Sequence, residues 1–477
     1  MSSLTSTTIK AFGWSAIEKF TVQGITFLLQ VILARLLVPS DYGIIGMVAI
    51  FLHIAQVFVD TGFANALIQK KECTQTDYST VFVYNLLVSI VIYVFFYFIS
   101  PFVAYFYETP ELTKVMRVIS ITIVLNAIPI VNRTILIKDV NFKIIAKISL
   151  IATITSGIIG VTMAYYGLGV WALCGQTIIL SVVQCILFYV FEKWRPSAIF
   201  SIKSFKLLFS FGSRMLITNL IGAFYTNMYT LVIGKRFSKV ELGNYTRADQ
   251  FASFPASSFV AIIARVVYPV FCKIQDDDKK LREAYRRIIR LSSYFIFPVM
   301  ICILSLAEPF IHVFLTDKWS GAVIFMQILS LDWILNHLTS INLNLLYVKG
   351  RTDLALRLEI IKKTIAVLIL IVSLNFGVIA MCIGRVVYSV IATVINTTYT
   401  KKFLSLGITE QIRDILPFLF GAFVTGAVIL FVIDLFVSPI VQLVVGLLVG
   451  LVCYFLISIL FFKSVVIELR NTKSKLS

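Results

Sequence analysis

Three basic residues, Lys19, Arg214 and Arg265, lie inside long apolar segments, each five to seven residues from one end of its segment. Because an ionisable group in lipid costs at least ~2.5–3.5 kcal/mol, each must face protein, water or a ligand. At a rise of 1.5 Å per residue, all three would lie roughly 8–10 Å below the membrane edge. Cations that meet at this depth are suited to binding an anion, and a phosphate or diphosphate headgroup sits at that level.

Other charges lie in the apolar segments as well. Arg385 is a fourth cation that we expect to contact the same anionic ligand. Three carboxylates are expected to be either ion-coupling groups or members of helix–helix ion pairs: Glu18, Asp60 and Asp332. The cations have a plainer alternative, since basic side chains also reach the interface by snorkelling or form ion pairs. No carboxylate lies close in sequence to Arg214 or Arg265, which favours an anionic ligand for these two.

Polar and aromatic side chains near Arg214 offer a second chemistry. Tyr225 can stack on a sugar ring, and Asn219 and Asn227 can hydrogen-bond a glycan. Interfacial anchoring and contacts between helices explain such residues equally well. The seven Cys show no CxxC spacing and the three His no HExxH spacing, so we expect neither a metal, a cofactor nor a catalytic constellation.

The elements that position these residues are membrane helices. Hydrophobic residues make up 59% of the 477 residues and charged ones 14%, and the mean hydropathy is +0.94. A water-soluble fold of this length cannot bury so much apolar surface. Runs of about twenty apolar residues without strand alternation predict an all-α polytopic protein. About fourteen such spans are expected: residues 13–37, 41–68, 79–105, 115–135, 143–166, 168–191, 207–233, 247–270, 288–315, 320–347, 354–376, 377–399, 412–433 and 438–462.

Charge predicts the orientation. The net charge is +18, from 42 Lys and Arg against 24 Asp and Glu, and most basic residues fall in alternate loops. The positive-inside rule accounts for this better than nucleic-acid binding, and it places both termini in the cytoplasm. One outer loop, residues 234–247, is basic against the rule.

The two halves of the sequence match weakly at an offset near 200 residues. Residues 40–43 (Ser-Asp-Tyr-Gly) align with residues 240–243 (Val-Glu-Leu-Gly), after the first span of each half. An even number of spans per half predicts parallel repeats, as in many transporters. We therefore expect an N-terminal lobe (1–195) and a C-terminal lobe (196–402) around a central cavity, with an extra helix pair and tail (403–477).

The opening run, from Gly13-Trp14-Ser15 through residues 30–43 (QVILARLLVPSDYG) to residues 60–63 (DTGF), resembles the polysaccharide transporter family. Residues 242–248 (LGNYTRA) extend the likeness. These are the Wzx-type flippases of the multidrug/oligosaccharidyl-lipid/polysaccharide exporter superfamily. The resemblance implies alternating access and a cationic cavity, and it assigns Lys19, Arg214 and Arg265 to the substrate.

The function expected is translocation of undecaprenyl-diphosphate-linked oligosaccharides, such as O-antigen, capsule or exopolysaccharide units, across the bacterial inner (cytoplasmic) membrane. Expected partners are this substrate, membrane lipids and a polysaccharide polymerase with chain-length proteins, and no nucleic acid. The alternative is an ion-coupled multidrug exporter of the same superfamily, for which an acid-dominated cavity is expected. A membrane enzyme is disfavoured, because no long outer loop carries catalytic groups.

Overall fold

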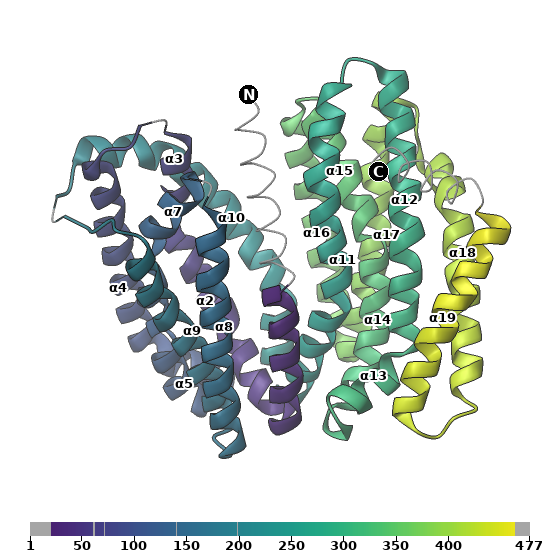
Figure 1. Ribbon diagram of the computed structural model, residues 1–477, viewed down its shortest axis with the longest axis horizontal. Helices are drawn as coiled ribbons and strands as arrows, with labels where there is room; N and C mark the ends of the chain where they lie inside the picture. The colour runs from purple at the N-terminus through teal and green to yellow at the C-terminus, as the bar shows by residue number, and fades with distance from the viewer. Residues whose placement is uncertain (1–20, 61–62, 71, 140, 198, 463–477) are drawn as a thin grey trace. The chain divides into compact units, whose positions relative to one another are not determined.

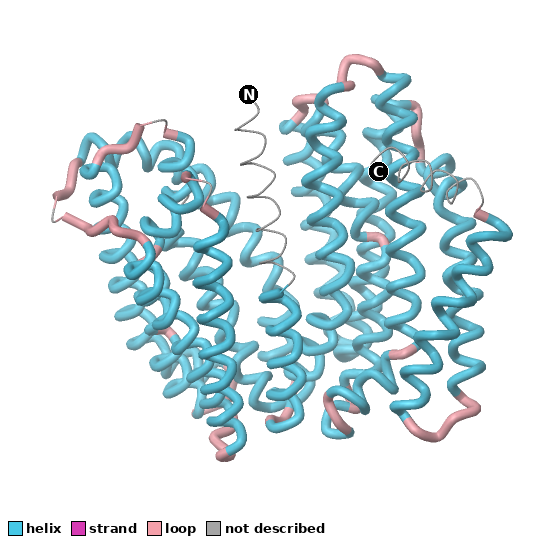
Figure 2. Tube along the Cα trace, viewed as in Figure 1, coloured by secondary structure: helices cyan, strands magenta, loops and turns pink. Residues whose placement is uncertain are grey.

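The computed structural model describes residues 21–60, 63–70, 72–139, 141–197 and 199–462, and these residues are almost entirely helical, with no strand among them (Figures 1 and 2). The chain divides after Gly243 into two compact units. An all-α fold is the outcome expected for a chain in lipid, where each backbone polar group needs a partner within its own segment.

The first unit contains the helix Thr21–Leu36 and the helices that follow it. They are α2 (Pro39–Asp60), α3 (Phe63–Gln69), α4 (Gln75–Phe106), α5 (Glu111–Ile119), α6 (Ile121–Ala127), α7 (Ile130–Lys138), α8 (Phe142–Tyr165), α9 (Val170–Phe191), α10 (Ile202–Arg236) and the first residues of α11 (Lys239–Lys273).

The second unit contains the rest of α11 and the remaining helices. They are α12 (Asp278–Ser305), α13 (Ala307–Phe314), the 3-10 turn Asp317–Trp319, α14 (Ala322–Ile334), α15 (Asn336–Val348), α16 (Thr352–Ser373), the 3-10 turn Leu374–Phe376, α17 (Gly377–Leu404), α18 (Ile408–Ile433) and α19 (Pro439–Phe461).

Nine helical segments of the described chain are long and apolar enough to cross a bilayer, or ten if the bent pair Glu111–Ala127 and Ile130–Lys138 is one span. One of the nine, Asp353–Leu404, has 52 residues and is turned at Gly377, whose φ of 91° favours glycine. At 1.5 Å per residue it would reach about 78 Å if straight, which is more than two bilayer cores. Its length is therefore sufficient for two crossings.

Helix α19 shows why lipid must surround the fold. Leu451 and Phe455 are 71% and 63% exposed, and only 22% of the most apolar stretch of this helix is buried inside the protein. Burying apolar surface is worth roughly 25 cal/mol per Å², so exposure of such a helix to water would be very unfavourable. The packed interior of the second unit is formed instead by buried side chains such as Phe271 of α11 and Tyr285 and Phe297 of α12.

The repeated turn of the sequence is also repeated in the structure. Asp41 Oδ2 accepts the amide hydrogen of Val38 at 3.2 Å, and Glu241 Oε2 accepts that of Ser238 at 3.1 Å, an offset of 200 residues for donor and acceptor alike. Each carboxylate thus binds a free amide at the start of its helix, α2 or α11. The two turns have the same local geometry.

These two helix starts also contact each other reciprocally. A Cβ at Gly43 would overlap the carbonyl oxygen of Lys239, and one at Gly243 would overlap that of Pro39. The two contacts are related by the same 200-residue offset, so a local two-fold relation holds at this crossing. Small residues allow such close backbone approach between membrane helices.

Alanine at Gly43 or Gly243 is therefore expected to lower the melting temperature of the purified protein. The added methyl group forces the backbones apart, and overpacking of this kind costs about 1–3 kcal/mol. Gly222→Ala on α10 is the matched control, because a Cβ there meets nothing within 4 Å. Equal melting temperatures for Gly43→Ala and Gly222→Ala would show that the crossing tolerates a side chain.

Residues 278–287, with several basic side chains after an acidic start, form the first turns of α12. Asp277 caps this helix, since its Oδ1 accepts the amide hydrogen of Lys280 at 3.0 Å. That hydrogen bond lowers the pKa of Asp277. The segment is thus continuous with a helix that is long and apolar enough to cross a bilayer.

Candidate functional site

A buried charge cluster lies in the second unit, where Arg385 of α17 meets carboxylates from two other helices. Its Nη2 lies 2.7 Å from Asp332 Oδ2 on α14, and its Nη1 lies 3.0 Å from Asp249 Oδ1 on α11. Nη1 also donates to the Tyr245 hydroxyl at 2.6 Å. The side chains of Arg385 and Asp332 are 14% and 13% exposed, so the pair is largely removed from solvent. Figure 1 shows α14 and α17 side by side in this unit.

Neighbouring polar groups hold the two carboxylate-bearing segments in place. Trp333 Nε1 donates to Asp249 Oδ1 at 3.1 Å, and Ser389 Oγ donates to the Asp332 carbonyl at 3.0 Å. Two carboxylates and one guanidinium leave the cluster with one net negative charge. An excess carboxylate in a largely buried site can take up a proton or a small cation, which is the chemistry that ion coupling needs.

This cluster contains two residues predicted from the sequence and one that was missed. Asp332 was expected as an ion-coupling group or an ion-pair partner, and it forms an ion pair with Arg385. Asp249 was overlooked because it lies near an expected span end, where a carboxylate needs no explanation. Its spacing of four residues from Tyr245 places both on one face of α11, and that helical spacing was the available signal.

The residues expected to bind the diphosphate are described only in part. Lys19 and Glu18 lie outside the described residues. Arg214 lies on α10 and Arg265 on α11, each in the half of its helix remote from the turn at residues 237–238, and their side chains are outside the description. Their convergence stays a prediction. Arg385, expected to be the fourth ligand, has its guanidinium engaged by Asp332 and Asp249.

The residues expected to contact a glycan belong to α10. Asn227 Nδ2 donates to the Ala223 carbonyl at 2.8 Å and lies 2.8 Å from His53 Nδ1 of α2. Tyr225 is partly buried and Asn219 is exposed. The amide of Asn227 therefore joins two helices, which is the alternative role that the sequence left open for it.

Asp60 ends α2 and is exposed there. Its Oδ1 accepts a 3.4 Å hydrogen bond from Gln56 Nε2, one turn earlier on the same helix. Among the described residues, no group of three or more His, Cys, Asp or Glu is placed to hold a metal ion.

Two of the basic residues in the segment expected on the outer side, residues 234–247, pair with acids from another turn of the first unit. Lys235 Nζ lies 2.9 Å from Glu108 Oε1, and Lys239 Nζ lies 3.8 Å from Glu111 Oε2. These residues border a cavity of about 590 Å³ between the turns at 107–111 and 235–239. Lys235 and Lys239 therefore have local negative partners.

Apolar helices that must lie in lipid, with a charge cluster buried among them, define a polytopic α-helical membrane protein. A family model described as polysaccharide biosynthesis protein matches residues 32–324. The chain belongs to this family, and the resemblance to the polysaccharide transporters found in the sequence is confirmed.

Two curated relatives agree with this assignment. The lipopolysaccharide biosynthesis protein WzxC of Escherichia coli (strain K12) is 25% identical over 441 residues, which cover 90% of this chain and 89% of WzxC. The teichuronic acid biosynthesis protein TuaB of Bacillus subtilis (strain 168) is 26% identical over 357 residues, 74% of each chain.

Solved structures share the fold. The lipid II flippase MurJ, in an inward closed conformation, superimposes with a TM-score of 0.78 at 16% identity, covering 95% of this chain and 99% of MurJ. An inward-facing multidrug resistance MATE family transporter gives a TM-score of 0.62 at 16% identity, covering 82% and 98%. At these identities the likeness establishes the fold alone.

Proposed function

We propose that this protein is a flippase that moves undecaprenyl-diphosphate-linked oligosaccharide repeat units from the inner to the outer leaflet of the bacterial cytoplasmic membrane. The observation that carries the proposal is the family match over residues 32–324. The names of WzxC and TuaB connect such chains to lipopolysaccharide and teichuronic acid biosynthesis. The fold shared with a lipid II flippase supports a lipid-linked glycan as cargo.

The proposed architecture is that of fourteen spans, in an N-terminal lobe (1–195), a C-terminal lobe (196–402) and an added helix pair with its tail (403–477). Both termini face the cytoplasm in this arrangement, as the distribution of Lys and Arg indicates. The matching turns at Asp41 and Glu241 support parallel repeats, since their capping hydrogen bonds recur at an offset of 200 residues.

In the proposed mechanism, Lys19, Arg214 and Arg265 bind the diphosphate in the inward-open state. Charge-assisted hydrogen bonds from guanidinium groups suit phosphate oxygens, and Arg presents them as a planar fork. The polyprenyl chain stays in lipid while the glycan enters the cavity, where Tyr225 and Asn219 are the proposed contacts. Rocking of the lobes then exposes the headgroup to the outer side.

The acidic cluster supplies a route for energy coupling. Asp332, Asp249 and Arg385 together carry one net negative charge, and uptake of a proton or a sodium ion would neutralise it. Glu18 and Asp60 are the alternative coupling carboxylates. Binding of a cation here would bias the packing of α11, α14 and α17, which the cluster joins.

The second candidate function is ion-coupled export of cationic drugs, favoured by the fold shared with a MATE family transporter. The same acidic cluster is the observation that supports it, since a carboxylate suits an organic cation. The two candidates differ in cargo charge. A flippase for diphosphates binds anionic lipids, whereas a drug exporter binds lipophilic cations.

Analysis of copurified lipid tests the proposal. The full chain, purified in a mild detergent from a strain that makes a polyprenyl-linked glycan, is expected to retain polyprenyl diphosphate species detectable by mass spectrometry. A Lys19→Ala, Arg214→Ala and Arg265→Ala triple variant should retain at least ~10-fold less, because it loses its charge-assisted contacts. Equal retention by both proteins would contradict the proposed site.

A further inference from the structure

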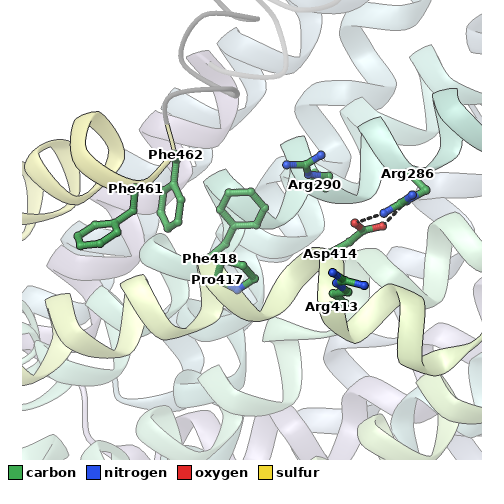
Figure 3. Close-up of a pocket in the computed structure, with 8 residues that line it drawn as sticks. All are labelled: Arg286, Arg290, Arg413, Asp414, Pro417, Phe418, Phe461 and Phe462. Carbon is green, nitrogen blue, oxygen red and sulfur yellow. Dashed lines mark hydrogen bonds and ion pairs between the residues drawn. The ribbon is translucent and has the colours of Figure 1, made fainter.

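A small pocket lies at one end of α12, α18 and α19, in the second unit (Figure 3). Its volume is about 210 Å³. A headgroup would fit, but a whole lipid would not.

The wall of this pocket is divided into a basic and an aromatic part. Figure 3 shows the guanidinium groups of Arg286, Arg290 and Arg413 at one end and the rings of Phe418 and Phe462 at the other. A ligand held here would present an anion to the arginines and an apolar portion to the rings. Such a combination of surfaces is suited to a lipid at the level of its headgroup.

One of the three arginines is already paired. Arg286 Nε donates to Asp414 Oδ2 at 2.7 Å, and its Nη2 donates to Asp414 Oδ1 at 2.6 Å. This two-point bond ties α12 to α18 and keeps Arg286 at the pocket wall. Since three cations face one carboxylate, the pocket carries two net positive charges.

The other two arginines supply that excess. No ion pair joins Arg290 or Arg413 to a carboxylate in the described part of the chain. Arg290 is one turn beyond Arg286 on the same face of α12, and Arg413 directly precedes Asp414 on α18. Two helices thus bring their free cations to one cavity, which is unfavourable unless an anion joins them.

The depth of the site agrees with a headgroup. Arg413 lies twenty residues before Ile433, the end of α18, which is about 30 Å along a helix. This distance equals the hydrocarbon thickness of a bilayer, so Arg413 lies at the membrane interface. Phe461 and Phe462, at the end of α19, lie at the same end of the bundle.

From these features we propose that the pocket between α12, α18 and α19 binds the phosphate of a membrane lipid, with Arg290 and Arg413 as its ligands. The phosphate oxygens accept hydrogen bonds from the two guanidinium groups, and the adjoining acyl or isoprenoid chain lies along Phe418 and Phe461. Two lipids offer this chemistry: an anionic phospholipid such as phosphatidylglycerol, and a polyprenyl diphosphate.

The test measures lipid binding rather than transport, so its failure would leave the proposed function intact. The full chain in neutral detergent is titrated with phosphatidylglycerol, phosphatidylcholine or undecaprenyl diphosphate, and bound lipid is counted by native mass spectrometry. The wild type is expected to retain phosphatidylglycerol in preference to phosphatidylcholine. Arg290→Gln with Arg413→Gln should weaken this retention at least ~10-fold, because both charge-assisted contacts are lost.

Arg282→Gln is the matched control, because it removes the same charge from α12 outside the pocket. If the double variant loses only the binding of phosphatidylglycerol, the pocket is a phospholipid site. If it also loses the binding of undecaprenyl diphosphate, the pocket is a site for the lipid carrier. Unchanged retention of both lipids, or an equal loss in Arg282→Gln, would overturn the proposal. If the double variant does not purify, Arg413→Gln alone is expected to weaken lipid binding at least ~3-fold. Unchanged retention of both lipids by this single variant, or an equal loss in Arg282→Gln, would then overturn the proposal.

Discussion

Replacing Arg385 with Met is expected to destabilise the protein severely and to abolish transport. The substitution leaves Asp249 and Asp332 facing each other without their cation, and removal of one partner from a buried ion pair costs about 3–5 kcal/mol. We expect a large fall in the melting temperature of the detergent-purified variant. We also expect loss of glycan export in a complementation assay.

Two further variants separate charge from packing in this experiment. Arg357→Met on α16 removes the same charge from an exposed position and should melt near the wild type. Adding Asp332→Asn to Arg385→Met reduces the net charge of the cluster from −2 to −1 and should recover part of the lost stability. If Arg385→Met and Arg357→Met have equal melting temperatures, the cluster contributes little to the stability of the protein.

The second large effect is expected at Arg214 and Arg265. Alanine at either position removes a proposed ligand of the diphosphate, and a hydrogen bond to a charged group is worth about 1.5–3 kcal/mol, or roughly 10- to 150-fold. Flipping in reconstituted vesicles should fall by such a factor for each variant.

Two further variants on α10 serve as controls. Lys203→Ala removes an exposed charge from the start of α10 and is expected to keep wild-type flipping. Arg214→Lys keeps a point charge and loses the planar fork, so an intermediate rate is expected. Wild-type rates in both Arg214→Ala and Arg265→Ala would remove these residues from the substrate site.

The sequence predicted helices well where apolar runs end in clear breakers. Residues 438–462 were expected as the last span, and α19 covers Pro439–Phe461. Breaks within apolar runs were not predicted. Residues 320–347 were expected as one span, and Ala322–Val348 is one apolar helical segment of 27 residues. The turn at Leu335, which divides it into α14 and α15, was not predicted, because no proline or glycine marks it.

The candidate site shows the same limit. Asp332 and Arg385 stood out because a single charge in an apolar run needs an explanation. Asp249 did not, and its contact with Arg385 spans 136 residues of sequence. Only the packing of α11, α14 and α17 brings these three groups together, and no local pattern encodes that packing. The pairing of Lys235 with Glu108 was invisible for the same reason.

Flipping of a purified lipid-linked oligosaccharide by the reconstituted chain tests the central claim most directly. Vesicles that contain the protein should move an undecaprenyl-diphosphate-linked glycan to the opposite leaflet well above the rate of protein-free vesicles, and they should leave a lipophilic cationic dye untransported. Dye transport driven by an ion gradient, with glycan flipping no faster than in empty vesicles, would contradict the account.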